Sequence, residues 1–225
     1  MLAGEPLITR VIQRVQEHGL VDELVVATDS PLVAQVAERS GVRGVLTART
    51  HSTGTDRVAE VASWEEFVGF DLVVNIQGDE PFLAREALAG AIARVADGDE
   101  VGTAAAPLDP ALAEDPARVK VVTDARGRAL YFSRAAIPHR REPGEPAATL
   151  YWQHLGLYAY ARDALRRWSR LEPSPAEVAE RLEQLRALHH GLRIGVARLR
   201  EPVEPGVDTP EDLRRAEAHW HALQR

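Results

Sequence analysis

Apolar and polar positions along the chain follow two periods, one typical of helices and one typical of buried strands. Between residues 7 and 18 the apolar residues stand at 7, 8, 11, 12 and 15, a stripe that predicts an amphipathic helix. Further helices are predicted from Pro31 onward and over 55–64 and 85–95, and short apolar runs predict strands at 24–27, 44–46, 72–76 and 102–106. This alternation of strands and helices predicts an α/β fold with a parallel core and right-handed crossovers.

The pattern changes between residues 119 and 160. Runs at 119–123, 129–133 and 155–160 predict antiparallel strands, with a turn at 124–127 and a loop rich in proline, glycine and charge at 138–148. Two closing helices are predicted over 175–189 and 210–223. We therefore expect one α/β domain over 1–225, with a mixed, mostly parallel sheet flanked by helices and an antiparallel arm over 119–160.

Composition narrows the class of protein. A chain of 225 residues with 45% hydrophobic and 27% charged residues can bury one sizeable core. It has no apolar run of membrane-spanning length and no signal-peptide pattern, so we expect no membrane insertion. The absence of cysteine excludes disulfides and thiolate chemistry. We therefore expect a cytoplasmic protein. The formal net charge of -7 argues against a nucleic-acid partner.

The segment Asn75-Ile76-Gln77-Gly78-Asp79-Glu80-Pro81 carries the clearest chemical signal. It follows the apolar run 72–74, so Gly78 and Asp79 stand at the carboxyl end of a predicted strand, where open α/β sheets bind ligands. Gly78 permits close approach of a phosphate or sugar, and Asp79 is an oxygen donor suited to Mg²⁺. A polar turn with a capping aspartate is the alternative interpretation.

This segment resembles the signature of the 3-deoxy-manno-octulosonate cytidylyltransferases. Seven further stretches resemble the same family in the same order: Val26-Ala27-Thr28-Asp29, residues 51–57, Val119-Lys120-Val121-Val122, residues 129–134, residues 153–158, Glu183-Gln184-Leu185-Arg186 and residues 206–212. The resemblance covers nearly the whole chain. It implies a nucleotide-diphospho-sugar-transferase-like (Rossmann-like) fold and a homodimer formed through the arm.

The resemblance also implies a reaction. CTP would donate its cytidylyl group to 3-deoxy-D-manno-octulosonate (Kdo), giving CMP-Kdo and pyrophosphate and activating Kdo for lipopolysaccharide biosynthesis. Asp79 and Asp208 would be the catalytic metal ligands for Mg²⁺, although Asp208 could instead cap the last helix. A nucleotidyltransferase for a related sugar acid and an inactive or truncated paralogue that binds nucleotide or a partner without turnover are the competing hypotheses.

Two sets of binding residues follow from the same resemblance. The nucleotide set comprises Ser52, Gly54, Thr55, Arg57, Gln77 and Gly78, and the sugar-acid set comprises Arg134, His154, Glu183 and Gln184. Each has a structural alternative. The residues before the helix at 55 could form a plain cap and turn, His154 could be a structural histidine bonded to backbone, and residues 183–184 could be a solvated helix face.

One departure from the family pattern concerns the N-terminus. Family members begin with a strand and a basic phosphate-binding loop, whereas Met1-Leu2-Ala3-Gly4-Glu5-Pro6-Leu7-Ile8 resembles the stretch just after that loop. We therefore expect that roughly two dozen upstream residues, one strand plus its turn, are absent and that Met1 is a late start or the result of a truncation.

Overall fold

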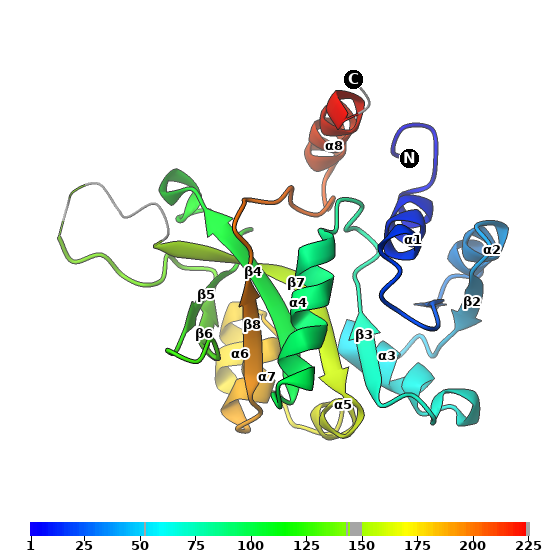
Figure 1. The fold of residues 1–225 in the computed structure, drawn as a ribbon, viewed down its shortest axis with the longest axis horizontal. Coiled ribbons are helices and arrows are strands. Elements are labelled where there is room, and N and C mark those ends of the chain that lie inside the picture. The colour runs from blue at the N-terminus through cyan, green and yellow to red at the C-terminus, as the bar shows by residue number, and fades with distance from the viewer. Residues whose placement is uncertain (52, 143, 145–149, 224–225) are drawn as a thin grey trace. The chain divides into compact units, whose positions relative to one another are not determined.

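The helices and strands of the chain have well-defined bounds in the computed structural model, which describes residues 1–51, 53–142, 144 and 150–223. The helices are α1 (Leu7–His18), α2 (Pro31–Arg39), α3 (Gly54–Ala62), α4 (Arg85–Ala96), α5 (Arg162–Trp168), α6 (Pro175–Glu180), α7 (Gln184–His189) and α8 (Pro210–Leu223), with short 3₁₀ turns at Glu65–Phe67 and Pro110–Leu112. The strands are β1 (Val25–Thr28), β2 (Arg43–Leu46), β3 (Leu72–Asn75), β4 (Val101–Leu108), β5 (Lys120–Thr123), β6 (Ala129–Ser133), β7 (Tyr151–Ala161) and β8 (Ile194–Arg198). Figure 1 shows these elements in chain order.

The chain divides into two compact units. The first comprises Met1–Phe67, Ile76–Arg85 and Val203–Arg225, and the second comprises Val68–Asn75 and Glu86–Pro202. The single domain expected over 1–225 stays a prediction.

The first unit contains a two-stranded parallel sheet of β1 and β2. The apolar stripe of α1 is buried here: Ile12 is 2% exposed and packs in one cluster with Val26 of β1, Ala37 of α2 and Val42. Burial of such side chains stabilises each by about 1.5–3 kcal/mol, so the helical period read from 7–18 is explained by this contact. The expected bounds of α1 are confirmed.

The second unit is built around β7, an 11-residue strand. One edge of β7 pairs with β4 along its length; the other pairs with β3 near its end and with β5 near its start. The order β6-β5-β7-β4-β8 therefore joins the core strands and the arm in one sheet, as Figure 1 shows.

The mixed α/β sheet is confirmed, but its expected mostly parallel character is wrong. Among the described strands, only β1–β2 and β4–β8 are parallel, whereas β3–β7, β4–β7, β5–β6 and β5–β7 are antiparallel. The reason is the length of β7, which extends beyond the predicted 155–160 and enters the core between β3 and β4.

Helix α4 covers one face of this sheet, with α6 and α7 on the opposite face (Figure 1). The contact with α4 is so close that only glycine fits at two positions. An added Cβ on Gly102 of β4 would lie 1.9 Å from the carbonyl oxygen of Ala91, and one on Gly90 of α4 would lie 2.5 Å from Ala197 Cβ. These glycines let the helix backbone rest directly on the strands.

The expected helix over 175–189 is broken in two. Arg181 takes left-handed backbone angles (φ 52°, ψ 50°) at the end of α6, and α7 begins at Gln184. The strand β8 and the helix α5 are present although the sequence pattern did not predict them. Among the described residues, no helix is long and apolar enough to cross a membrane.

Candidate active site

A turn at residues 77–80 presents the acidic pair Asp79-Glu80. The strand β3 ends at Asn75, and the backbone N–H of Glu80 then donates to the carbonyl of Gln77 at 3.3 Å, which closes the turn. Gly78 is exposed, and a Cβ there would meet Ile8 Cδ1 at 3.3 Å. The expected strand–turn–acid arrangement is therefore present.

Asp208 lies beside this turn in the same unit. The backbone N–H of Val207 donates to the carbonyl of Asp79 at 2.9 Å, and Gly206 lacks the Cβ that would come within 3.2 Å of Glu80 Oε1. The carboxyl groups of Asp79 and Asp208 consequently come within hydrogen-bonding reach of each other. Tertiary structure thus pairs two acids that are far apart in sequence.

The alternative role of Asp208 as a helix cap is taken by its neighbour. Thr209 Oγ1 accepts from the backbone N–H of Asp212 at 3.1 Å, and Asp212 Oδ2 accepts from the backbone N–H of Thr209 at 2.9 Å. This reciprocal pair caps α8. The side chain of Asp208 is therefore not used for capping, and it faces Asp79 instead.

The electrostatics of this acidic cluster favour a cation. Burial, followed by the charge of Asp208, raises the pKa of Asp79, and burial followed by the charges of Asp79 and Asp208 raises the pKa of Glu80 to about 7. Among the described residues, no arginine, lysine or histidine offsets either shift. When two carboxylates repel one another in this way, a divalent cation bound between them stabilises their charged forms.

The cluster is small for a complete metal site. No group of three or more histidine, aspartate or glutamate side chains is arranged to hold a metal in the parts of the chain that the structure describes. Two aspartates would leave coordination positions for water and substrate oxygens, which is the usual arrangement for Mg²⁺.

The nucleotide set lies in the same unit as the acidic cluster. Helix α3 begins at Gly54 and its cap is Thr53, whose side chain accepts from the backbone N–H of Asp56 at 3.1 Å. Thr55 is 2% exposed, and Ser52 lies outside the described residues. Capping therefore accounts for Thr53, and the roles of Gly54 and Thr55 toward a nucleotide stay predictions.

Arg57 is held by its own unit. Its guanidinium donates to Thr47 Oγ1 at 2.5 Å and lies 3.7 Å from Asp29 Oδ1. Asp29 follows the end of β1 and Thr47 follows the end of β2. The parallel pairing of these two strands brings the two residues next to each other. A contact of Arg57 with a ligand stays a prediction, and the same holds for Gln77 and Gly78.

The sugar-acid set lies in the second unit. His154 of β7 is partly buried, and its Nε2 lies 3.0 Å from Thr103 Oγ1 of β4. Burial lowers the pKa of His154 to about 3, so the imidazole is neutral. The expected structural alternative, a hydrogen bond from the ring to backbone, is replaced by this bond to a hydroxyl.

Glu183 and Gln184 begin helix α7. Gln184 is 5% exposed, so residues 183–184 are not simply a solvated face. The negative charge of Glu183, after burial and the neighbouring Tyr160, raises the pKa of Tyr158, whose ring centroid is 5.4 Å from that of His154. Tyr158 therefore lies beside His154 and within the electrostatic influence of Glu183, and it was not among the predicted site residues although it stands in the stretch 153–158.

Arg134 is used differently from the other members of its set. Its Nε donates to the carbonyl of Glu180 at 2.9 Å and its Nη1 to the carbonyl of Pro116 at 2.8 Å. Its backbone N–H also donates to Glu180 Oε2 at 2.9 Å. These bonds fix the end of α6 against β6, and a contact of Arg134 with substrate stays a prediction.

Comparison with known proteins gives one consistent family. The cytidylyltransferase family model matches residues 1–194. A 3-deoxy-manno-octulosonate cytidylyltransferase of Gemmatimonas aurantiaca is 51% identical over 99% of this chain and 87% of its own length, and one of Methylococcus capsulatus is 47% identical over 97% and 88%.

Solved structures are similar as well. The structure of CMP:2-keto-3-deoxy-manno-octonic acid synthetase complexed with CTP superposes with a TM-score of 0.90 at 36% identity, covering 99% of this chain and 90% of that chain. A 4-diphosphocytidyl-2C-methyl-D-erythritol synthase from Anaerococcus prevotii has a TM-score of 0.62 at 15% identity, covering 100% and 92%, and shares the fold alone.

Proposed function

Because the chain belongs to the family of 3-deoxy-manno-octulosonate cytidylyltransferases, we propose that it transfers the cytidylyl group of CTP to Kdo. The anomeric hydroxyl oxygen of Kdo bonds to the α-phosphorus of CTP, and the bond from that phosphorus to the β-phosphate oxygen breaks. The hydroxyl loses its proton, and CMP-Kdo and pyrophosphate are the products. Such a displacement depends chiefly on positioning and charge neutralisation.

The observation that carries this proposal is the pairing of Asp79 with Asp208. Asp79 lies at a turn after a strand and is partly buried, Asp208 is exposed beside it, and no basic side chain among the described residues offsets the raised pKa of Asp79. We assign Asp79 and Asp208 as the residues that would hold Mg²⁺. When bound, this ion neutralises phosphate charge and polarises the α-phosphoryl group.

The sugar-acid set would orient the acceptor. Since His154 is neutral and its Nε2 is bonded to Thr103, it can hydrogen-bond a substrate hydroxyl only through Nδ1 and does not supply a positive charge for the sugar carboxylate. Glu183 and Gln184 add an acceptor and an amide at the start of α7. Together they would bind hydroxyls of Kdo.

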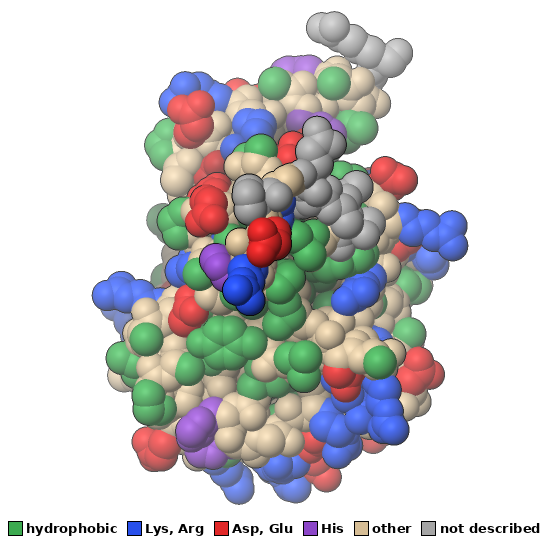
Figure 2. Space-filling model, turned by 90° about the vertical axis from the view of Figure 1, so that its left-hand side faces the viewer, with side chains coloured by type: hydrophobic (Ala, Val, Ile, Leu, Met, Phe, Trp, Pro, Cys, Tyr) green, Lys and Arg blue, Asp and Glu red, His purple; other side chains and the backbone are tan. Residues whose placement is uncertain are grey.

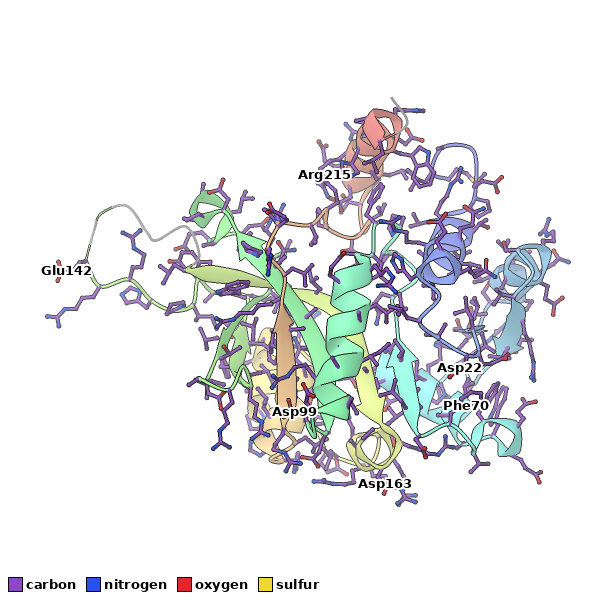
Figure 3. The ribbon with its side chains drawn as sticks, viewed as in Figure 1. Asp22, Phe70, Asp99, Glu142, Asp163 and Arg215 are labelled. Atoms are coloured by element: carbon purple, nitrogen blue, oxygen red, sulfur yellow. The ribbon has the colours of Figure 1, made fainter. Side chains whose placement is uncertain are left out.

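The experiment is pyrophosphate release by this chain with Mg²⁺, CTP and Kdo. We expect release that needs all three, and a loss of about 100-fold or more in kcat for Asp79→Asn and for Asp208→Asn. A matched control is Asp163→Asn on α5, whose side chain is 81% exposed and points outward in Figure 3. Full activity in either of the first two variants would contradict the metal assignment, and absence of release from the unchanged chain would contradict the function.

We also propose that the chain forms a homodimer through the arm over 119–160. The strand β6 is an edge strand of the sheet. Two adjacent residues within it, Leu130 and Tyr131, are 62% and 37% exposed. Figure 2 shows hydrophobic side chains gathered in the middle of the face on the β5–β6 side. Not all arm aromatics support this, because Phe132 and Tyr158 are buried within the unit.

Light scattering tests the dimer directly. We expect a mass of about twice 24.7 kDa for the unchanged chain and a shift toward the monomer mass for Leu130→Glu combined with Tyr131→Glu. A monomer mass for the unchanged chain would overturn the dimer without affecting the proposed reaction. Cytoplasmic localisation stays a prediction from composition.

A further inference from the structure

The strand β7 contains a bulge opposite Thr103. Thr103 of β4 pairs with Tyr158, but the next residue, Ala104, pairs with Leu155, so Gly156 and Leu157 have no partner on β4. Such a bulge re-aims the neighbouring side chains and is frequent beside active sites. Here it directs the carbonyls of Leu155 and Leu157 toward the side chain of Thr103.

Three polar atoms surround the Thr103 hydroxyl, which belongs to a residue that is 0% exposed. Its Oγ1 lies 2.7 Å from the carbonyl oxygen of Leu157, 3.3 Å from that of Leu155 and 3.0 Å from His154 Nε2. A carbonyl can only accept, and the hydroxyl has one hydrogen to give. The hydrogen therefore goes to Leu157, because two oxygens 2.7 Å apart without a hydrogen between them would repel.

This assignment fixes the tautomer of the imidazole. Since the hydroxyl hydrogen is already used, Thr103 Oγ1 accepts from His154, and Nε2 must carry the hydrogen. A neutral imidazole has one N–H, so Nδ1 has the lone pair. Among the described residues Nδ1 makes no hydrogen bond, and the ring is held in place by Phe132 and Tyr158 at centroid distances of 4.9 and 5.4 Å.

We propose that Thr103 is a positioning residue that sets His154 as the Nε2–H tautomer, so that Nδ1 accepts a hydrogen bond from a hydroxyl of the sugar-acid substrate. This rests on the proposed function only for the identity of that substrate. Thr103 itself, being buried, does not touch the substrate. It acts through the orientation and tautomer of His154.

The tautomer is tested first, without any substrate. In the full chain labelled with ¹⁵N-histidine, nitrogen shifts and long-range couplings distinguish Nε2–H from Nδ1–H, and His154→Gln identifies the His154 signals among the 8 histidines. We expect His154 as Nε2–H in the unchanged chain. Observation of Nδ1–H there would overturn the proposal regardless of any activity measurement.

The variants Thr103→Val and Thr103→Ser test the role in binding. Valine keeps the shape but removes the acceptor, so we expect the Nε2–H tautomer to lose its dominance and the KM for Kdo to rise about tenfold, with the KM for CTP unchanged. Serine keeps the hydroxyl and should retain both the tautomer and the KM. Thr9→Val, at another buried threonine that is 7% exposed, is the matched control.

The outcomes separate this inference from the proposed function. An unchanged KM for Kdo in a folded Thr103→Val would overturn the positioning role. Equal rises in the KM values for Kdo and CTP would reduce Thr103 to a structural residue and also overturn it. If the unchanged chain releases no pyrophosphate with Kdo, the proposed function fails, whereas the tautomer measurement still decides the Thr103–His154 assignment.

Discussion

The neutral, partly buried imidazole of His154 should make folding stability depend on pH. Burial lowers the pKa of His154 from 6.5 to about 3 in the folded chain, while the unfolded chain has the ordinary value. Below pH 6.5 the unfolded state therefore binds a proton that the folded state does not. Stability contributed by this site is complete above pH 6.5 and is lost progressively as the pH falls from 6.5 toward 3.

The magnitude follows from the two pKa values. Each pH unit inside this window costs about 1.4 kcal/mol, so at pH 5 the site has lowered the free energy of unfolding by about 2 kcal/mol relative to pH 7. This is a large share of the roughly 5–15 kcal/mol that stabilises a typical domain. At pH 7 the cost is close to zero.

Urea unfolding at pH 7 and pH 5 measures this dependence. We expect the loss of stability between the two values to be about 2 kcal/mol smaller in His154→Gln than in the unchanged chain. His221→Gln, at an exposed histidine of α8, is the control and should leave the difference nearly unaltered. An equal pH dependence in His154→Gln and the unchanged chain, or an NMR titration that shows His154 protonated at pH 5, would refute the reasoning.

Three further variants test the packing and the caps. Gly102→Ala should lower the free energy of unfolding by ~3 kcal/mol or more, because its Cβ would meet the carbonyl oxygen of Ala91 at 1.9 Å. The control Gly69→Ala places its Cβ in open space and should leave the free energy of unfolding in denaturant nearly unchanged. Thr209→Ala removes the cap of α8 and should cost about 1 kcal/mol in the same assay; no loss would show that the cap is dispensable. Asp99, labelled in Figure 3, is 4% exposed and pairs with two arginines, so Asp99→Ala should cost about 3 kcal/mol, and a change below about 1 kcal/mol would contradict the assigned burial.

Local pattern predicted most of the elements well. The stripe over 7–18 predicted α1 with its bounds, and the helix predicted over 210–223 corresponds to α8, because periodicity depends on neighbouring residues. It failed where tertiary contacts override local preference. The predicted helix over 175–189 is broken at Arg181, where the carbonyls of residues 180 and 181 accept from the guanidinium of Arg134 instead of continuing the helix.

The sheet shows the same limit. The strand β8 was not predicted, and its position is fixed by parallel pairing with β4. The strand β7 lies between β3 and β4 and is antiparallel to both. This pairing joins residues that are far apart in sequence, so a local sequence pattern does not predict it. The expected mostly parallel sheet was wrong for this reason.

The sequence by itself determined the family, the acidic turn after β3, and the residue types able to carry cytidylyl transfer, because motifs are contiguous and their chemistry is local. Only the tertiary structure decided which of these groups act together. It brings the carboxyl of Asp208 to that of Asp79, transfers the capping role to Thr209, engages Arg134 with backbone carbonyls, and places the Thr103 hydroxyl against His154. Hydrogen-bond partners and burial depend on distances between residues remote in sequence, and those distances exist only once the chain has folded.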